Sequence, residues 1–97
     1  MTMDEMVFEW NHEKASRNVR KHGITFEEAT SVFGDPLARV HDDPVHSTSE
    51  LREIIVGQSG LGRLLLVAFV ERGTRIRIIS ARRATPVERK DFEEASR

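Results

Sequence analysis

The chain has 97 residues, and its 16 acidic and 15 basic side chains leave a formal net charge of −1. The absence of cysteine excludes disulfides, thiolate metal sites and cysteine nucleophiles. No run of about 18 apolar residues is present to span a membrane, and residues 1–6 lack the apolar stretch of a secretion signal. We therefore expect a small cytoplasmic protein, with one compact domain over residues 1–97.

The N-terminal part of the chain is expected to form one strand and two helices. Residues 7–10 have the composition of a short strand, and Asn11 offers a side-chain acceptor that caps a helix over residues 12–22. The glycine that follows is a typical helix stop. Thr25 and Glu28 have the spacing of a capping box, so a second helix begins there and ends at a Gly-Asp-Pro sequence.

The rest of the chain is expected to form four strands and one helix. The strands are predicted over residues 37–41, 51–56, 64–70 and 75–84, and the last helix over residues 86–96. Thr85 and Glu88 form a second capping box before that helix. Short turns between consecutive strands favour antiparallel pairing. The order β-α-α-β-β-β-β-α therefore predicts an α+β fold, with an antiparallel sheet and helices packed mainly on one face.

Arginine is concentrated in one segment. Residues 63–83 carry a net charge of +5, with Glu71 as the only acid and six arginines: Arg63, Arg72, Arg75, Arg77, Arg82 and Arg83. Alternation along the last strand places Arg75, Arg77 and, further on, Ala81 on the face that points away from the helices. Guanidinium groups suit forked recognition of phosphate. The arginines could simply decorate a solvated face, but the shortage of acids favours an anionic partner.

Lys21 and His22 are the best candidates for proton transfer. An imidazole changes charge between about pH 5 and 8, which suits acid–base chemistry, although a histidine in the last helical turn also stabilises the helix end. One loop combines metal-binding residue types (His41, Asp42, Asp43 and His46), but a solvated loop is the favoured interpretation and no metal is expected. Trp10 is expected in the core rather than stacked on a base.

Two long motifs resemble the BrnT toxin family. The first comprises FEWN at residues 8–11, KHGITFEEA at 21–29 and VFGDP at 32–36. The second is RIRIISARRAT at residues 75–85, followed by Glu88 and by Phe92. Asn11 stands where the family commonly has Asp, which keeps the helix cap. Phe92 stands where Tyr is common, which removes a hydroxyl group.

The resemblance implies a RelE-like fold and a type II toxin, a ribonuclease that arrests translation by cutting mRNA. It also implies a BrnA antitoxin, which neutralises the toxin and brings a ribbon-helix-helix part that binds operator DNA. For such an enzyme, without metal or other cofactor, the expected catalytic residues are Arg75, Arg77, Lys21 and His22. Arg63, Arg72, Arg82 and Arg83 are expected to bind RNA phosphates. Two alternatives lack catalysis: a module that binds the antitoxin, and a corepressor of its own operon.

Overall fold

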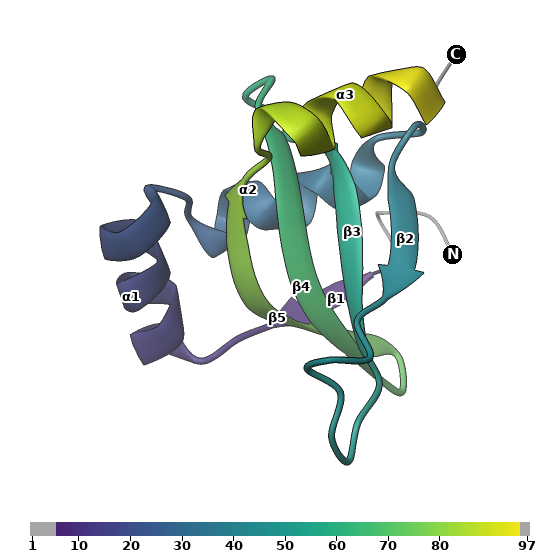
Figure 1. The fold of residues 1–97 in the computed structure, drawn as a ribbon. Helices are drawn as coiled ribbons and strands as arrows, with labels where there is room; N and C mark the ends of the chain where they lie inside the picture. The colour runs from purple at the N-terminus through teal and green to yellow at the C-terminus, as the bar shows by residue number, and fades with distance from the viewer. Residues whose placement is uncertain (1–5, 96–97) are drawn as a thin grey trace.

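The computed structural model describes residues 6–95 and contains the three helices and five strands that the sequence predicts, in the same order (Figure 1). Their bounds are β1 Val7–Glu9, α1 His12–His22, α2 Phe26–Ser31, the 3₁₀ turn η2 Val32–Gly34, β2 Arg39–Asp42, β3 Arg52–Gln58, β4 Leu64–Arg72, β5 Arg75–Arg83 and α3 Pro86–Ala95. In the part of the chain that is described, no helix is long and apolar enough to cross a membrane.

Side-chain caps define the helix ends, as expected. Asn11 and Thr25 each accept a hydrogen bond from the first turn of the helix that follows, at 3.0 Å in both cases. Gly23 ends α1 in the left-handed conformation with φ 71°, which glycine adopts without steric cost because it has no Cβ atom. Thr85 and Glu88 exchange two hydrogen bonds at the start of α3. Local sequence therefore sets where each helix begins and where α1 ends.

The five strands form one sheet in the order β1-β5-β4-β3-β2. The pairs β2–β3, β3–β4 and β4–β5 are antiparallel, as the short connections predict. β1 runs parallel to β5, with Val7 opposite Arg75, so the sheet is mixed and the prediction of a wholly antiparallel sheet is wrong at this strand. The two strands are far apart in sequence, and the long crossover between them permits a parallel pairing that a hairpin forbids.

A register shift in β5 changes which residues share a face. The ladder between β4 and β5 is irregular between Ala68 and Phe69: Phe69 pairs with Ile78, whereas Ala68 pairs with Ser80. One extra residue on β5 reverses the alternation beyond it. Ala81 is therefore buried in the core and does not share the face of Arg75 and Arg77 as expected. Arg82, opposite Leu66, takes that face instead.

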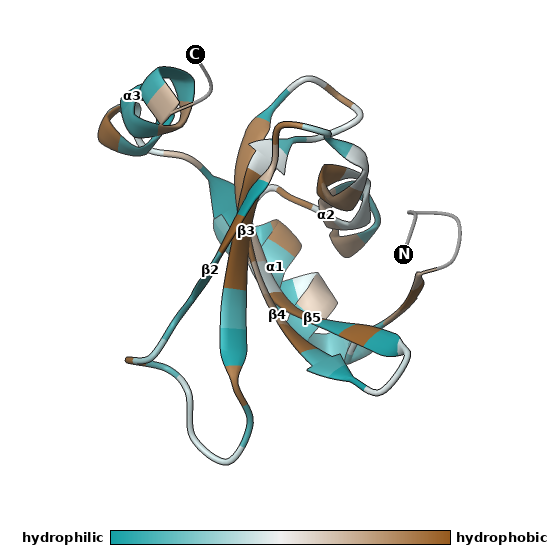
Figure 2. Ribbon diagram, turned by 90° about the vertical axis from the view of Figure 1, so that its right-hand side faces the viewer, coloured by the Kyte–Doolittle hydropathy of each residue, from teal (hydrophilic) through white to brown (hydrophobic). Residues whose placement is uncertain are grey.

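The two faces of the sheet are covered differently (Figure 2). α1, α2 and η2 lie on one side, so the helices are mainly on one face, as expected. The core there contains Ile24, Phe26, Ala29, Val32, Ile55, Leu65, Val67, Phe69, Ile76, Ile78 and Ala81. On the other side only α3 is present, and it covers one end. We call this second side the open face; its residues include His41, Ile54, Val56, Leu66, Ala68, Ser80 and Arg82.

Candidate functional site

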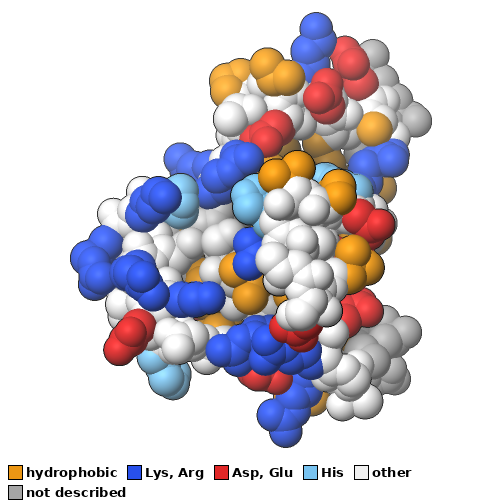
Figure 3. Space-filling model, turned by 60° about the horizontal axis from the view of Figure 1, so that its bottom comes forward, with side chains coloured by type: hydrophobic (Ala, Val, Ile, Leu, Met, Phe, Trp, Pro, Cys, Tyr) orange, Lys and Arg blue, Asp and Glu red, His pale blue; other side chains and the backbone are white. Residues whose placement is uncertain are grey.

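The open face contains a hollow of about 390 Å³ beside the end of α1. Its floor is made by Ile54, Leu66, Ala68 and Ser80 from three adjacent strands, and its rim by Lys21, His22, Asp43, His46, Arg52 and Arg82. We call it the central hollow. Figure 3 shows Lys and Arg side chains gathered on the α1 side of the molecule and around a patch of hydrophobic side chains. An apolar floor with a basic rim suits an anionic ligand that has flat, apolar parts.

A buried asparagine positions the part of the rim that α1 supplies. α1 is polar, and Asn18 is its only buried residue. The Asn18 side-chain amide donates to the carbonyl groups of Ile24 at 2.9 Å and Ala81 at 2.8 Å, and its oxygen accepts from the Ala81 N–H at 3.1 Å. These three hydrogen bonds tie α1 to β5 and to Ile24, which lies just after the end of α1. Lys21 and His22, one turn further on, thereby reach the open face.

The loop between β2 and β3 supplies the opposite rim and is held by hydrogen bonds. The Asp43 N–H donates to the Arg52 carbonyl at 2.8 Å. The Ser47 hydroxyl donates to the Asp43 carbonyl at 2.8 Å and accepts from the Arg52 N–H at 2.9 Å. His46 contacts the Asp43 carboxylate through Nδ1, 2.9 Å from Oδ2. The Asp43 side chain is 13% exposed and that of His46 is 63% exposed, so a carboxylate that is mostly shielded from solvent holds an accessible imidazole.

The loop group that sequence composition pointed to is divided between two places. Asp43 and His46 line the central hollow, whereas His41 lines a second hollow under α3. Within residues 6–95, no group of three or more His, Asp or Glu side chains is arranged to hold a metal ion. The resemblance and the local charge pattern did not single out His46 or Arg52. The spacing of Asp43 and His46, three residues apart, is the signal that could have indicated their pairing.

Arg82 is the one arginine of residues 63–83 that lines the central hollow. Its guanidinium donates to both carboxylate oxygens of Glu88, at 2.8 and 2.9 Å. These hydrogen bonds, with a further one from the Thr85 backbone, lower the pKa of Glu88 to about 2. Arg82 is thus fixed on the rim by the first turn of α3.

Most of the other arginines in this segment form ion pairs with acids from elsewhere in the chain. Arg77 contacts Glu9 at 2.8 Å, and Arg72 contacts Glu50 at 2.7 Å and lowers its pKa. Arg63 forms a two-pronged ion pair with Glu28, which is buried, and its hydrogen bond lowers the pKa of that carboxyl group. The shortage of acids within residues 63–83 is therefore no guide to the charge around these arginines, because acids distant in sequence fold against them.

Within residues 63–83, exposed charge without a close ion pair remains on two arginines, both outside the central hollow. The Arg75 side chain is 64% exposed, with its nearest acid, Glu9, 4.0 Å away. Arg83 is exposed and has no ion pair among the described residues; together with Arg63 it lines a separate small hollow. The structure thus brings Lys21, His22 and Arg82 together, and it places the other predicted site residues away from them.

α1 carries the basic surface that the arginine segment was expected to provide. Four of its bases, Lys14, Arg17, Arg20 and Lys21, are exposed, and none forms an ion pair within the described residues. Glu13 is the only acid in the helix. Unpaired positive charge beside a hollow attracts anions more strongly than arginines that are already neutralised. Sequence reasoning missed this surface because it looked for the highest charge density and not for the fewest available partners.

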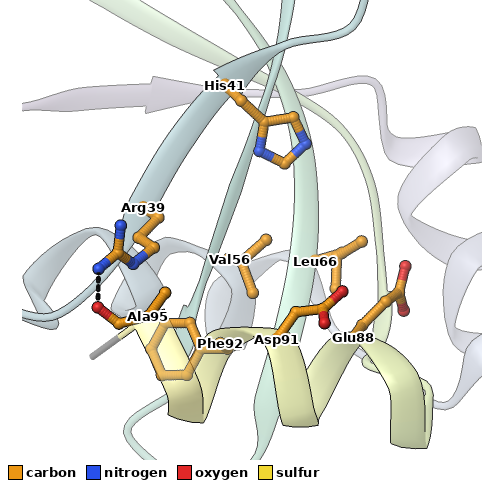
Figure 4. A pocket seen from close by; sticks show the side chains of 8 residues that line it. All are labelled: Arg39, His41, Val56, Leu66, Glu88, Asp91, Phe92 and Ala95. Atoms are coloured by element: carbon orange, nitrogen blue, oxygen red, sulfur yellow. Dashed lines mark hydrogen bonds between the residues drawn. The ribbon is translucent and has the colours of Figure 1, made fainter. Parts of the chain in front are cut away.

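A second hollow, of about 380 Å³, lies between α3 and the sheet (Figure 4). Phe92 and Ala95 of α3 face Val56 and Leu66, and Arg39 from β2 donates a hydrogen bond to the Ala95 carbonyl. Leu66 also belongs to the floor of the central hollow.

Trp10, whose ring packs edge-to-face on Phe26 at 6.0 Å between centroids, belongs to the helix side and packs against the core, as expected.

The fold and the hollow together describe the class of protein: a small α+β domain with a mixed five-stranded sheet and a basic hollow that suits an anionic ligand. The family described as "Ribonuclease toxin, BrnT, of type II toxin-antitoxin system" matches residues 10–88. The chain therefore belongs to the BrnT family of ribonuclease toxins. Membership implies an antitoxin partner and supports endoribonuclease activity.

A comparison with solved structures agrees on the fold. The chain is similar to the crystal structure of the Brucella abortus ribonuclease toxin BrnT, with a TM-score of 0.62 and 22% sequence identity. The match covers 82% of this chain and 96% of the Brucella chain. A comparison with curated protein sequences found no match.

Proposed function

We propose that this chain, as one toxin domain over residues 1–97, is an endoribonuclease that cuts mRNA in the central hollow without a metal ion. The carrying observation is that the hollow collects Lys21, His22 and Arg82, from opposite ends of the sequence, over an apolar floor. In such a reaction the ribose 2′-hydroxyl attacks the adjacent phosphate and leaves a 2′,3′-cyclic phosphate. The protein needs to supply proton transfer and positive charge at the phosphate.

The residues of the hollow fit these needs. Lys21, Arg52 and Arg82 would bind the scissile phosphate and stabilise the charge that develops on it, and His22 would transfer a proton. Arg75 and Arg77, at the other end of β5, would contact the RNA backbone further along the strand, together with Arg72 and Arg83. Arg77 and Arg72 would have to exchange a carboxylate for a phosphate to do so. The apolar floor would accept a nucleobase or ribose.

The antitoxin is proposed to be of the BrnA type, with a ribbon-helix-helix part. Its acidic residues would cover the basic surface of α1 and the central hollow, and so compete with RNA. The toxin would reach operator DNA only through this partner. Because mRNA is the substrate, the cytoplasm is the proposed location.

Expression of the chain without antitoxin tests the proposal. We expect breakdown of cellular mRNA, and we expect the purified protein to cut RNA in excess EDTA and leave cyclic-phosphate ends. An RNA with a single 2′-deoxy substitution at the cleavage position should resist cutting there, because it lacks the attacking hydroxyl. Intact RNA in both assays would favour the alternatives, a module that only binds the antitoxin or a corepressor. Cleavage that requires a metal would refute the metal-free reaction.

A further inference from the structure

The central hollow contains two imidazoles on opposite sides of its floor. His22 stands at the end of α1, beside β5, and His46 belongs to the loop that joins β2 to β3. Between them lie Ser80, Ala68 and Ile54, which are paired residues on three adjacent strands. Neighbouring strands are spaced about 4.8 Å apart, so this floor is roughly 10 Å across. A ribose and its 3′ phosphate fit in that width.

The ring of His46 is held in one orientation by its carboxylate partner. Asp43 accepts a hydrogen bond from Nδ1 of the imidazole, which assigns the ring proton of the neutral form to Nδ1 and leaves Nε2 as the basic atom. Asp43 itself is held by the hydrogen bonds from its backbone to Arg52 and Ser47. A carboxylate in this position also stabilises the imidazolium that forms when Nε2 takes a proton.

Positively charged side chains stand beside both imidazole rings. Lys21 is next to His22 in sequence, and Arg52 begins the strand that follows the loop of His46. Arg82 completes the rim and forms an ion pair with Glu88. A phosphate drawn to these cations would lie between the two imidazoles. The Asp43 carboxylate is the only acid among the residues that line the hollow, and it is turned to His46.

We propose that His46, oriented by Asp43, is the general base of the RNA cleavage and that His22 is its general acid. His46 Nε2 takes the proton of the 2′-hydroxyl as its oxygen bonds to phosphorus. His22 gives a proton to the 5′ oxygen as the bond between that oxygen and phosphorus breaks. One proton is taken and one is given, and the products are a cyclic phosphate and a 5′-hydroxyl. This inference rests on the proposed ribonuclease function; Asp43 is a positioning residue in it.

The test compares His46→Gln, His22→Gln and the control His12→Gln on two RNA oligonucleotides in EDTA. His12 is exposed at the start of α1 and lies outside the central hollow. On ordinary RNA, each of the first two variants should lose about 10²–10⁴-fold in cleavage rate, the usual contribution of a general acid or base. His12→Gln should cleave at the wild-type rate. Circular dichroism and binding to the antitoxin confirm that the variants are folded.

The second oligonucleotide carries sulfur in place of the 5′ oxygen at the cleavage position. A thiolate leaves without protonation, so His22→Gln should regain most of its activity on this substrate. His46→Gln should not, because the 2′-hydroxyl still needs a base. Asp43→Asn should lower kcat with KM unchanged, and the ¹⁵N spectrum of His46 should lose the Nδ1–H tautomer. Unchanged KM separates orientation of the ring from binding of RNA.

The outcomes separate this inference from the proposed function. If the wild type cuts RNA and His46→Gln cuts within about threefold of it, the base assignment is wrong while the ribonuclease stands. Rescue of His46→Gln rather than His22→Gln by the sulfur substrate would overturn the assignment of roles. If the wild type cuts neither substrate, the ribonuclease function fails, and the inference fails with it.

Discussion

Replacing Asn18 by alanine tests how α1 is attached to the sheet. The substitution removes three buried hydrogen bonds, two donated by the amide and one accepted by its oxygen. At about 1 kcal/mol net for each bond, the free energy of unfolding should fall by about 3 kcal/mol. The higher helix propensity of alanine returns only roughly 0.5 kcal/mol. In a domain whose total stability is of order 5–15 kcal/mol, this is a large loss.

Urea denaturation followed by tryptophan fluorescence measures this loss. Trp10 is the only tryptophan in the chain, and its ring packs on Phe26 in the core. At about 4–8 °C per kcal/mol for a domain of this size, the loss also lowers Tm by roughly 10–20 °C. Ser16→Ala, an exposed change in the same helix, is the control and should leave stability unchanged or slightly higher.

A second substitution at the same position isolates the two donors. Asn18→Asp keeps an acceptor for the Ala81 N–H but points a carboxylate at the carbonyl groups of Ile24 and Ala81. It should be at least as destabilising as alanine, because a buried charge then lacks a donor for its second oxygen. A loss below about 1 kcal/mol for alanine, or an aspartate variant as stable as the wild type, would refute the role of Asn18 as the attachment of α1.

Three further predictions concern ion pairs and the basic helix. Arg63→Ala should lower the midpoint of urea unfolding, because it removes the ion-pair partner of buried Glu28 and leaves that carboxylate the hydrogen bond from Ser59; loss of RNA affinity with unchanged stability would contradict this role. Ionised Glu88, whose pKa is lowered to about 2, stabilises the fold above about pH 4.5, and this stability is lost as the pH falls toward 2. Glu88→Gln should therefore make the free energy of unfolding depend less steeply on pH in that window, and an unchanged dependence would contradict the prediction. Arg17→Glu with Arg20→Glu should weaken RNA binding and reduce its salt dependence, measured by titration at several salt concentrations; unchanged affinity would place RNA elsewhere.

Sequence reasoning succeeded where the determinants are local. The caps at Asn11, Thr25 and Thr85 depend on residues within one helical turn. These features involve no distant contact. For the same reason, the number, type and order of the elements could be predicted from composition and spacing alone.

Sequence reasoning failed where distant segments meet. The partner of Arg77 is 68 residues away, and that of Arg63 is 35 residues away, so a charge count within one segment could not reveal either pair. The shift that buries Ala81 depends on how β5 pairs with β4, and alternation along β5 alone does not contain that information. At the candidate site, sequence reasoning pointed to Lys21, His22 and Arg82. The position of His46 in the same hollow depends on the path of the loop between β2 and β3.

The pairing of β1 with β5 has a consequence for how the sheet meets other polypeptide chains. β1 covers β5 only from Arg75 to Arg77, and further along the same edge the Asn18 amide bonds to both backbone groups of Ala81, as a neighbouring strand would. A side chain thus substitutes for a missing piece of strand. The opposite edge of the sheet is formed by β2, whose four residues are all exposed and include Arg39 and Asp42. Charge on a short edge strand opposes self-association, so an extended peptide that adds to the sheet at β2 would need side chains that complement that charge.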